Sequence, residues 1–275
     1  MSQLHRRADY QPPAYWIETV DLHVEVDTET RVTARLSVQR AEGVRADTPL
    51  RLDARGLTVV SMAVDGVPVP PEARPQTDLD VTLAGLPSAF MLETVTLLQP
   101  EANAALEGFY QSGPMYCTQC EAHGFSRITP FPDRPDVLSR FTVRLEADAV
   151  RFPVLLANGN RIEAGSLADG RHYAVWRDPH AKPCYLFAMV AGDLACVADT
   201  FEAADGRARR LEFYVDAGNE GLVGHAMQSL KDAMRWDEQT FGLVYDLDLY
   251  MVVAARAFNM GAMENKGLNI FNAAY

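Results

Sequence analysis

The chain has 275 residues, of which 48% are hydrophobic and 23% are charged, a composition typical of one large globular domain or two smaller ones. Its 37 acidic residues outnumber the 25 basic ones, which gives a formal net charge of -12. Because such a protein repels polyanions on average, we expect neither nucleic acid nor an anionic membrane surface as a main partner.

The sequence contains no segment that predicts export or membrane insertion. Its N-terminal stretch has basic residues but no apolar run of signal-peptide length after them, and no other stretch approaches the length of a transmembrane helix. The four cysteines, Cys117, Cys120, Cys184 and Cys196, are too few for a disulfide framework in a chain of this length. We therefore expect a cytoplasmic protein.

The first predicted elements are two strands that form a hairpin. Apolar and polar residues alternate over residues 20–26 and again over residues 32–38, which indicates strands with one face toward a core and one toward water. Further short strands are predicted at residues 79–86, 93–98, 141–145, 172–176 and 185–190.

Two dipeptides predict tight hairpin turns between strands. Asp65-Gly66 and Asn158-Gly159 supply the positive-φ residues that such turns require. We therefore expect an antiparallel, all-β domain that extends to about residue 193. Residues 114–135 fit this pattern least, since they are rich in Cys, Pro and Gly and have no clear period. Irregular segments of this kind are often functional, although an ordinary packed surface loop is at least as common.

After residue 193 the pattern changes to strand, helix, strand. Residues 209–216 and 246–254 alternate like strands, and a helix is predicted between them at residues 221–241. Gly242 stands where a C-terminal cap belongs. The apolar stripe predicted for this helix is Leu222, Ala226, Leu230, Ala233, Met234 and Phe241. This order indicates an α/β element that begins a second domain.

Several common site motifs are missing or incomplete. Cys117 and Cys120 form a C-x-x-C without the second pair of a zinc ribbon or the context of a redox motif, so we favour a structural role for both. None of the six histidines, His5 and His123 among them, has another His at helical spacing, and there is no H-E-x-x-H. No phosphate-binding loop and no G-x-S-x-G occurs, which disfavours nucleotide binding and serine acyl transfer.

The stretch "NMGAMENKGLNIF", residues 259–271, places one carboxylate in an apolar setting. Gly261 allows a ligand backbone to approach where a side chain would collide. An unpaired carboxylate is costly there, so Glu264 should meet a cation: Lys266 or Arg256 of its own chain, or the ammonium of a ligand. Spacing alone favours the internal partner, because structural ion pairs outnumber ligand sites.

Two segments resemble the aminopeptidase N family of zinc-dependent gluzincin aminopeptidases, in its bacterial cytosolic branch. "NMGAMENKGLNIFN", residues 259–272, is similar to the family's exopeptidase signature, with G-A-M-E-N intact. "YCTQCEAHGFSRITPFPDRPDVLSRF", residues 116–141, is similar to the acidic segment that the N-terminal domain lends to the active site. The resemblance extends through "NGNR", "KPCYLFAMVAGD" and "MRWDEQTFGL". It implies a β-rich domain, an antiparallel sandwich or saddle, over residues 1–193, and the incomplete start of an α/β thermolysin-like peptidase domain over residues 194–275.

The resemblance also implies roles for individual residues. Glu121 and Glu264 would hold the free α-ammonium of a peptide by charge-assisted hydrogen bonds, and an acylated nitrogen would leave both charges unpaired. Gly261 and Ala262 would present backbone groups to the substrate, and Met260 would form an adaptable wall for its first side chain. The substrate-binding residues implied in this way are Gln119, Glu121, Met260, Gly261, Ala262, Met263, Glu264 and Asn265.

The family's zinc site is not expected within this sequence. Catalysis in the family needs zinc, a Glu as general base and a Tyr at the oxyanion, and its H-E-x-x-H follows G-A-M-E-N, whereas this sequence stops at Tyr275. We expect one zinc ion in the complete enzyme, no zinc on this chain alone, and no release of N-terminal residues by the purified chain. Leu268 and Ile270 indicate a strand near the end, and because an unfinished sheet edge invites aggregation, we expect a truncated product.

The expected partners are peptides with a free N-terminus, with broad preference for basic and for small or apolar first residues, and the complete enzyme is expected to be a monomer. The alternative is a non-catalytic, β-rich peptide-binding or interaction module that keeps the two carboxylates. Coding DNA beyond Tyr275 separates the two, since a continuation into H-E-x-x-H favours the enzyme. A redox or zinc-ribbon protein built on Cys117 and Cys120 is a third, disfavoured interpretation.

Overall fold

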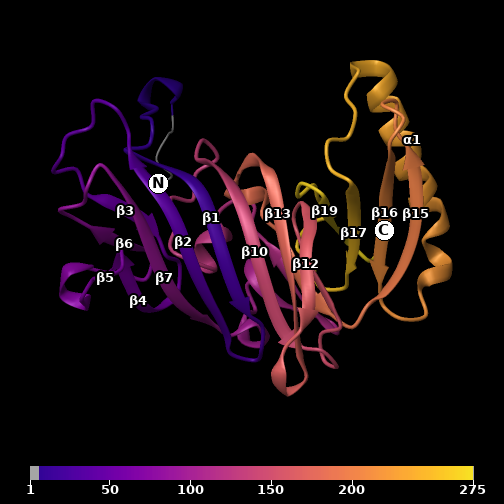
Figure 1. Cartoon of the computed structure of the whole chain (residues 1–275), viewed down its shortest axis with the longest axis horizontal. Coiled ribbons are helices and arrows are strands. Elements are labelled where there is room, and N and C mark those ends of the chain that lie inside the picture. Colours follow the sequence, from indigo (N-terminus) through magenta and orange to yellow (C-terminus); the bar gives the residue numbers. More distant parts are fainter. Residues whose placement is uncertain (1–5, 275) are drawn as a thin grey trace.

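A computed structural model describes residues 6–274, so His5 and Tyr275 lie outside the described residues. Figure 1 shows a large sheet toward one end of the molecule and the helix α1 at the other. Within the described chain, no helix combines the length and apolar character needed to cross a membrane. Short 3-10 helices occur at Arg7–Asp9, Pro71–Ala73, Pro100–Ala102, Phe125–Arg127, Ala168–Gly170, Cys184–Leu186 and Glu220–Leu222.

The N-terminal part is built on an eight-stranded sheet with the order β12-β13-β10-β1-β2-β7-β4-β5. Its strands are β1 (Tyr15–Glu25), β2 (Thr30–Arg40), β4 (Thr58–Val64), β5 (Val67–Pro68), β7 (Ala89–Leu98), β10 (Leu138–Asp148), β12 (Asn160–Ser166) and β13 (Arg171–Pro183). The predicted hairpin of β1 and β2 is confirmed. The expectation of a purely antiparallel domain is wrong, because β1 pairs with β10 in parallel. More than a hundred residues separate these strands, so no hairpin constrains their relative direction.

A four-stranded sheet with the order β11-β14-β9-β8 packs against the large one. Its strands are β8 (Gly108–Ser112), β9 (Met115–Gln119), β11 (Val154–Ala157) and β14 (Met189–Gly192), and β3 (Leu50–Asp53) pairs separately with β6 (Asp80–Leu83). Phe125 lies between the sheets, with its ring centroid 5.8 Å from that of Phe141 and 5.0 Å from that of Phe187. The β-rich N-terminal architecture is therefore confirmed.

One predicted turn is confirmed and the other is wrong. Asp65 and Gly66 form a two-residue loop between β4 and β5, with φ of 49° and 79°. Asn158 and Gly159 do not form a hairpin, because β11 pairs with β14 whereas β12 pairs with β13. The chain changes sheets at this point. The strand predicted at residues 185–190 is also shorter than expected, since it begins only at Met189.

A five-stranded sheet follows, with the order β15-β16-β17-β19-β18. Its elements are β15 (Ala195–Glu202), β16 (Ala208–Val215), α1 (Gly224–Phe241), β17 (Leu249–Ala255), β18 (Ala262–Met263) and β19 (Leu268–Asn272). The central strands β16, β17 and β19 run parallel, which confirms the predicted α/β element. Gly242 caps α1 as predicted, with φ of 66° and its N–H donated to Glu238 at 3.0 Å.

The predicted apolar stripe of α1 is partly wrong. The helix packs on the sheet through Met227 and Met234, whereas Leu222 is 78% exposed and Phe241 is 59% exposed. Since α1 begins after Leu222 and ends at Phe241, both residues lie at its ends, where they stay exposed. The buried stripe is rotated by one residue in the first half of the helix, with Val223 and Met227 in place of Leu222 and Ala226.

Candidate functional site

Glu121 lies in a tight turn of the irregular segment that follows β9. Gln119 ends β9 and pairs with Gly108 of β8. Gly124 donates its N–H to the carbonyl of Cys120 at 2.8 Å, which folds the chain back. A Cβ on Gly124 would lie 2.9 Å from the backbone nitrogen of Gly108, so only glycine allows this approach. Glu121 is exposed on this fold, whereas Gln119 is buried.

The buried residue Asp133 stabilises this segment through hydrogen bonds. Its carboxylate accepts hydrogen bonds from the Ser126 backbone N–H at 2.9 Å and from the Cys184 thiol at 3.1 Å. Its own N–H donates to Asp53 at 3.2 Å, and its carbonyl lies 3.1 Å from Nδ1 of His123. Sequence reasoning missed Asp133, because none of these partners lies at a spacing that forms a motif.

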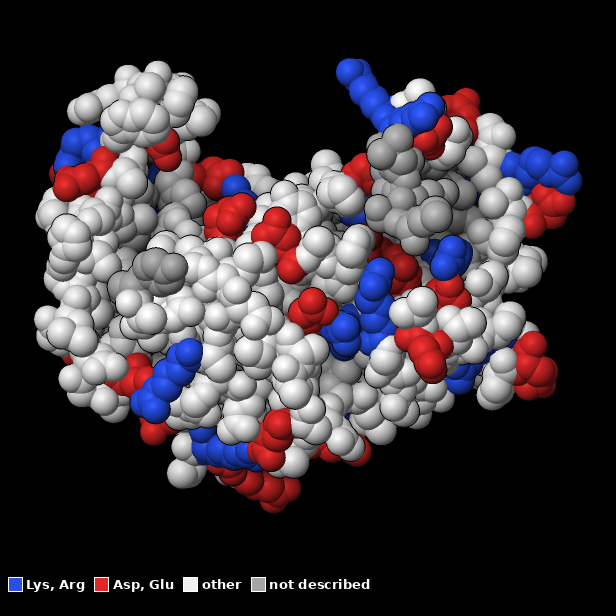
Figure 2. Space-filling view, turned by 180° about the vertical axis from the view of Figure 1, so that it is seen from behind, with Lys and Arg blue, Asp and Glu red and all other residues white. Residues whose placement is uncertain are grey.

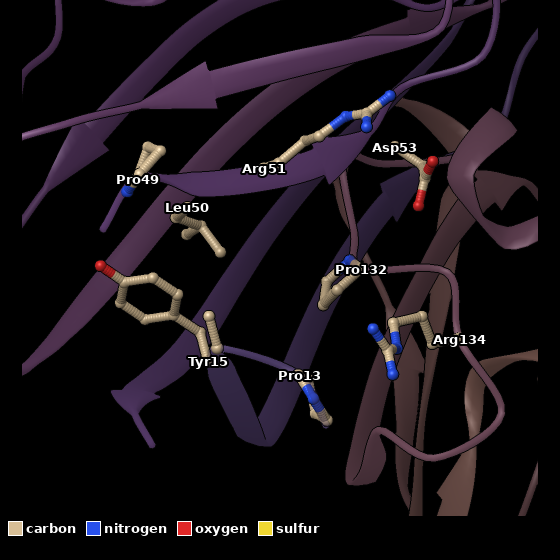
Figure 3. A pocket seen from close by; sticks show the side chains of 9 residues that line it. Pro13, Tyr15, Pro49, Leu50, Arg51, Asp53, Pro132 and Arg134 are labelled. Carbon is tan, nitrogen blue, oxygen red and sulfur yellow. The ribbon is translucent and has the colours of Figure 1, made fainter. Parts of the chain in front are cut away.

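A pocket of about 310 Å³ lies next to this support and is distinct from the candidate site. Figure 3 shows Arg51, Asp53 and Arg134 on its wall. Arg51 pairs with Asp80 at 2.5 Å, and Arg134 pairs with Asp136 at 2.6 Å. Both guanidinium groups of this pocket therefore already have carboxylate partners, and the Asp53 carboxylate accepts the Asp133 N–H.

The C-x-x-C thiols are packing groups in this fold. Cys117 and Cys120 are fully buried, and burial raises the pKa of the Cys117 thiol to about 12. Burial also raises the pKa of Cys120 well above its ordinary value. Both thiols are therefore protonated at neutral pH, which disfavours nucleophilic or metal-binding roles.

The second candidate segment forms the end of the five-stranded sheet. Ala262 and Met263 of β18 pair with β19, and the connection closes with a hydrogen bond from Leu268 N–H to the Asn265 carbonyl at 3.0 Å. Met263 and Asn265 are buried, whereas Glu264 between them is exposed. The backbone on both sides of Glu264 is thus fixed while its carboxylate stays accessible.

Contacts along β8 bring the two segments to one region of the molecule. The hydroxyl of Tyr110 donates a hydrogen bond to the Ala257 carbonyl at 3.1 Å, and the backbone N–H of Ala257 donates one to the Ser112 hydroxyl at 2.8 Å. The Asn259 amide donates to the carbonyl of Ala105 at 3.1 Å, just before β8 begins. The chain that leads into Met260 and Gly261 therefore runs beside β8, which also pairs with the strand that leads into Glu121.

The predicted internal partner of Glu264 is wrong. Lys266 directs its ammonium to Asp246, with both Nζ–Oδ distances at 2.8 Å. Arg256 pairs instead with Asp216. Lys266 and Arg256 therefore both pair with aspartates and not with Glu264.

Among the residues that the structure describes, Glu121 and Glu264 are both exposed carboxylates without a protein partner. Over residues 6–274, neither side chain forms an ion pair or a hydrogen bond. Two buried amide oxygens, Oε1 of Gln119 and Oδ1 of Asn265, also lack a protein partner. A cationic ligand with N–H donors would complement both kinds of acceptor.

Zinc ligands do not gather in the described part of the chain. No group of three or more His, Cys, Asp or Glu residues there is placed to hold a metal ion. The residues present therefore do not fit a zinc site.

On the face shown in Figure 2, basic side chains lie among acidic ones and form no continuous band.

Two family models match the chain. The Peptidase M1 N-terminal domain matches residues 11–186, and the Peptidase family M1 domain matches residues 225–275. The chain is 49% identical over 273 residues to aminopeptidase N of Escherichia coli and 52% identical over 271 residues to aminopeptidase N of Caulobacter vibrioides. These alignments cover 99% and 97% of the chain but only 31% of each relative. The chain thus spans about a third of the length of these relatives.

Solved structures agree with this assignment. Aminopeptidase A of Legionella pneumophila, in complex with aspartic acid, superposes with a TM-score of 0.92 at 32% identity, over 96% of this chain and 31% of that one. An M1 zinc metallopeptidase of Deinococcus radiodurans shares the fold, with a TM-score of 0.79 at 20% identity over 95% of this chain and 61% of that one. From its N-terminal sheets to the strands that flank Glu264, the chain belongs to the M1 peptidase family.

Proposed function

We propose that this chain supplies the amine-recognition part of an aminopeptidase site, in which Glu121 and Glu264 together accept hydrogen bonds from the free α-ammonium of a peptide. The observation that carries the proposal is a pair of accessible carboxylates that have no cation partner within residues 6–274, on two segments that both run beside β8. An ammonium offers three donors to such acceptors, whereas an acylated nitrogen would leave two charges uncompensated.

The edge of the five-stranded sheet supports binding of the substrate main chain. β18 is the last strand in the sheet order and, among the described residues, pairs with β19 alone, so an added strand of substrate would pair along its other edge. The carbonyl of Gly261 is already used, since it accepts the Asn272 N–H at 2.9 Å. The remaining backbone groups of Gly261 and Ala262 would contact the substrate, and half-buried Met260 would line the pocket for its first side chain.

We further propose that zinc-dependent hydrolysis belongs to a complete enzyme with one zinc ion, by analogy with the M1 zinc metallopeptidase of Deinococcus radiodurans. Since residues 6–274 hold no fitting ligand group, no catalytic step is assigned to this chain. A cytoplasmic location, a monomeric state, a lack of nucleic-acid or membrane partners, and a domain boundary near residue 193 are parts of the same proposal.

Calorimetric titration with L-alaninamide and with N-acetyl-L-alaninamide tests the proposed recognition. We expect the purified chain to bind the free amine and not the acetylated compound. Glu121→Gln and Glu264→Gln should each weaken binding by about tenfold or more, because each removes a charged hydrogen-bond acceptor. Glu18→Gln, on the exposed face of β1, is the matched control and should bind like the unmodified chain. Equal binding of both compounds would refute the proposal.

A further inference from the structure

A buried amide joins the two parts of the fold that carry the candidate site. Asn158 is 1% exposed and lies where the chain passes from β11 to β12. Its Nδ2 group donates to the carbonyl of Leu186 at 3.0 Å and to the carbonyl of Lys266 at 2.8 Å. Its Oδ1 accepts the N–H of Ala188 at 2.7 Å. Both donors and the acceptor of this side chain are therefore used.

On one side, Asn158 connects to the strand that leads to Glu121. Ala188 immediately precedes β14, and β14 pairs with β9, with Val190 opposite Cys117. The hydroxyl of Thr118 on β9 accepts the Met189 N–H at 3.0 Å. β9 ends at Gln119, so a short path of hydrogen bonds, through the side chains of Asn158 and Thr118, links Asn158 to the strand before Glu121.

On the other side, Asn158 holds the turn that carries Glu264. Lys266 is fixed at both ends, by Asn158 at its carbonyl and by Asp246 at its ammonium. The next residue, Gly267, has φ of 72°, and a Cβ there would lie 2.9 Å from Leu247 and 3.5 Å from the nitrogen of Gly159. The turn thus packs closely on the chain segment of Asn158.

We propose that Asn158 is a positioning residue for the amine site, which sets the placement of Glu264 relative to Glu121. This inference rests on the proposed function. Charged hydrogen bonds depend steeply on distance and angle, so a shift of the turn at Lys266 would move Glu264 out of reach of an ammonium held by Glu121. Without Asn158, the Lys266 carbonyl loses its buried donor and the turn loses its link to β14.

Asn160 provides a matched control only two residues away. It also joins the two parts of the fold, through hydrogen bonds of 3.0 and 3.1 Å to Asp248. Asp248 precedes β17, and neither of its two hydrogen bonds with Asn160 involves the turn that carries Glu264. A general weakening of the contact between the two parts would affect Asn158→Ala and Asn160→Ala alike, whereas a positioning role would affect only Asn158→Ala.

The experiment compares both variants by hydrogen–deuterium exchange and by titration with L-alaninamide. In Asn158→Ala we expect faster exchange at residues 261–268 and about tenfold weaker binding. Asn160→Ala should match the unmodified chain in both measurements. Equal exchange and equal binding in the two variants would overturn the proposal.

A second variant keeps the test decisive if Asn158→Ala does not fold. Gly267→Ala crowds the same turn against Leu247, at 2.9 Å, whereas its distance of 3.5 Å to the nitrogen of Gly159 is an ordinary contact. It should show the same pattern, and unchanged binding by a folded Gly267→Ala would also overturn the proposal. If the unmodified chain binds no amine, the proposed function fails, while the exchange difference between Asn158→Ala and Asn160→Ala still decides whether Asn158 holds the turn.

Discussion

At the scale of single residues, burial decides the chemistry of the cysteines. Desolvation raises the pKa of all four thiols, but Cys117, Cys120 and Cys184 are buried whereas Cys196 is exposed. We therefore expect the folded chain to react with Ellman's reagent at one thiol, Cys196, at pH 8, and at all four after unfolding. Rapid reaction of a second thiol in the folded chain would contradict the assigned burial.

The same burial predicts a stability change in alkali. The Cys117 thiol ionises near its ordinary pKa of 9.0 when unfolded and only near about 12 when folded. The stability that this thiol contributes is therefore present below pH 9 and is lost as the pH rises from 9 toward 12, by about 1.4 kcal/mol per pH unit. Urea unfolding as a function of pH should show a shallower decline for Cys117→Ala, and identical slopes would contradict this origin.

The partners of the charged residues near Glu264 could not be predicted from spacing. Lys266 and Arg256 are the nearest cations in sequence, but their partners Asp246 and Asp216 are 20 and 40 residues away. Those pairs form only because β16, β17 and β19 align in the folded sheet. The roles of Glu121 and Glu264 came from the family resemblance, and the lack of competing cations supports them.

At the scale of elements, Gly159 marks the passage between sheets. It has φ of 91°, and a Cβ would lie 2.2 Å from the carbonyl oxygen of Arg177. Gly159→Ala should lower the free energy of unfolding by about 3 kcal/mol or more. Gly66→Ala is the matched control, because Gly66 also has positive φ but its Cβ would meet nothing, so the expected loss is about 1 kcal/mol. Equal losses in thermal or urea unfolding would contradict the close approach.

Local sequence patterns predicted where strands and turns lie better than they predicted which strands pair with each other. Alternation correctly located β1 and β2, and Asp65-Gly66 correctly indicated a hairpin, because both signals act within a few residues. Asn158-Gly159 carries the same turn signal, but its neighbours pair with other strands. Strand pairing depends on long-range burial, which is also why the parallel pairing of β1 with β10 was not predicted.

At the scale of the whole molecule, an apolar groove of about 470 Å³ lies between α1 and the strands β16, β17 and β19. Its walls include Leu230, Ala226, Val252 and Phe271. We expect the chain to bind an environment-sensitive apolar dye here. Ala226→Glu should abolish the fluorescence increase, because it places a charge in the groove.

The control for this groove is His225→Glu, an exposed position on α1 that does not line it. It should leave dye binding unchanged. Equal dye fluorescence in Ala226→Glu and His225→Glu would show that the dye binds elsewhere. Ala226 and Leu230 belong to the predicted apolar stripe and line this groove, but the groove itself depends on the spacing between α1 and the sheet, which local sequence patterns do not show.

The most direct test of the central claim is a crystal structure of the chain with L-alaninamide. We predict that the ligand's ammonium nitrogen lies about 3 Å from a carboxylate oxygen of Glu121 and about 3 Å from one of Glu264. An ammonium bound by only one of these residues, or at another site, would contradict a shared amine site.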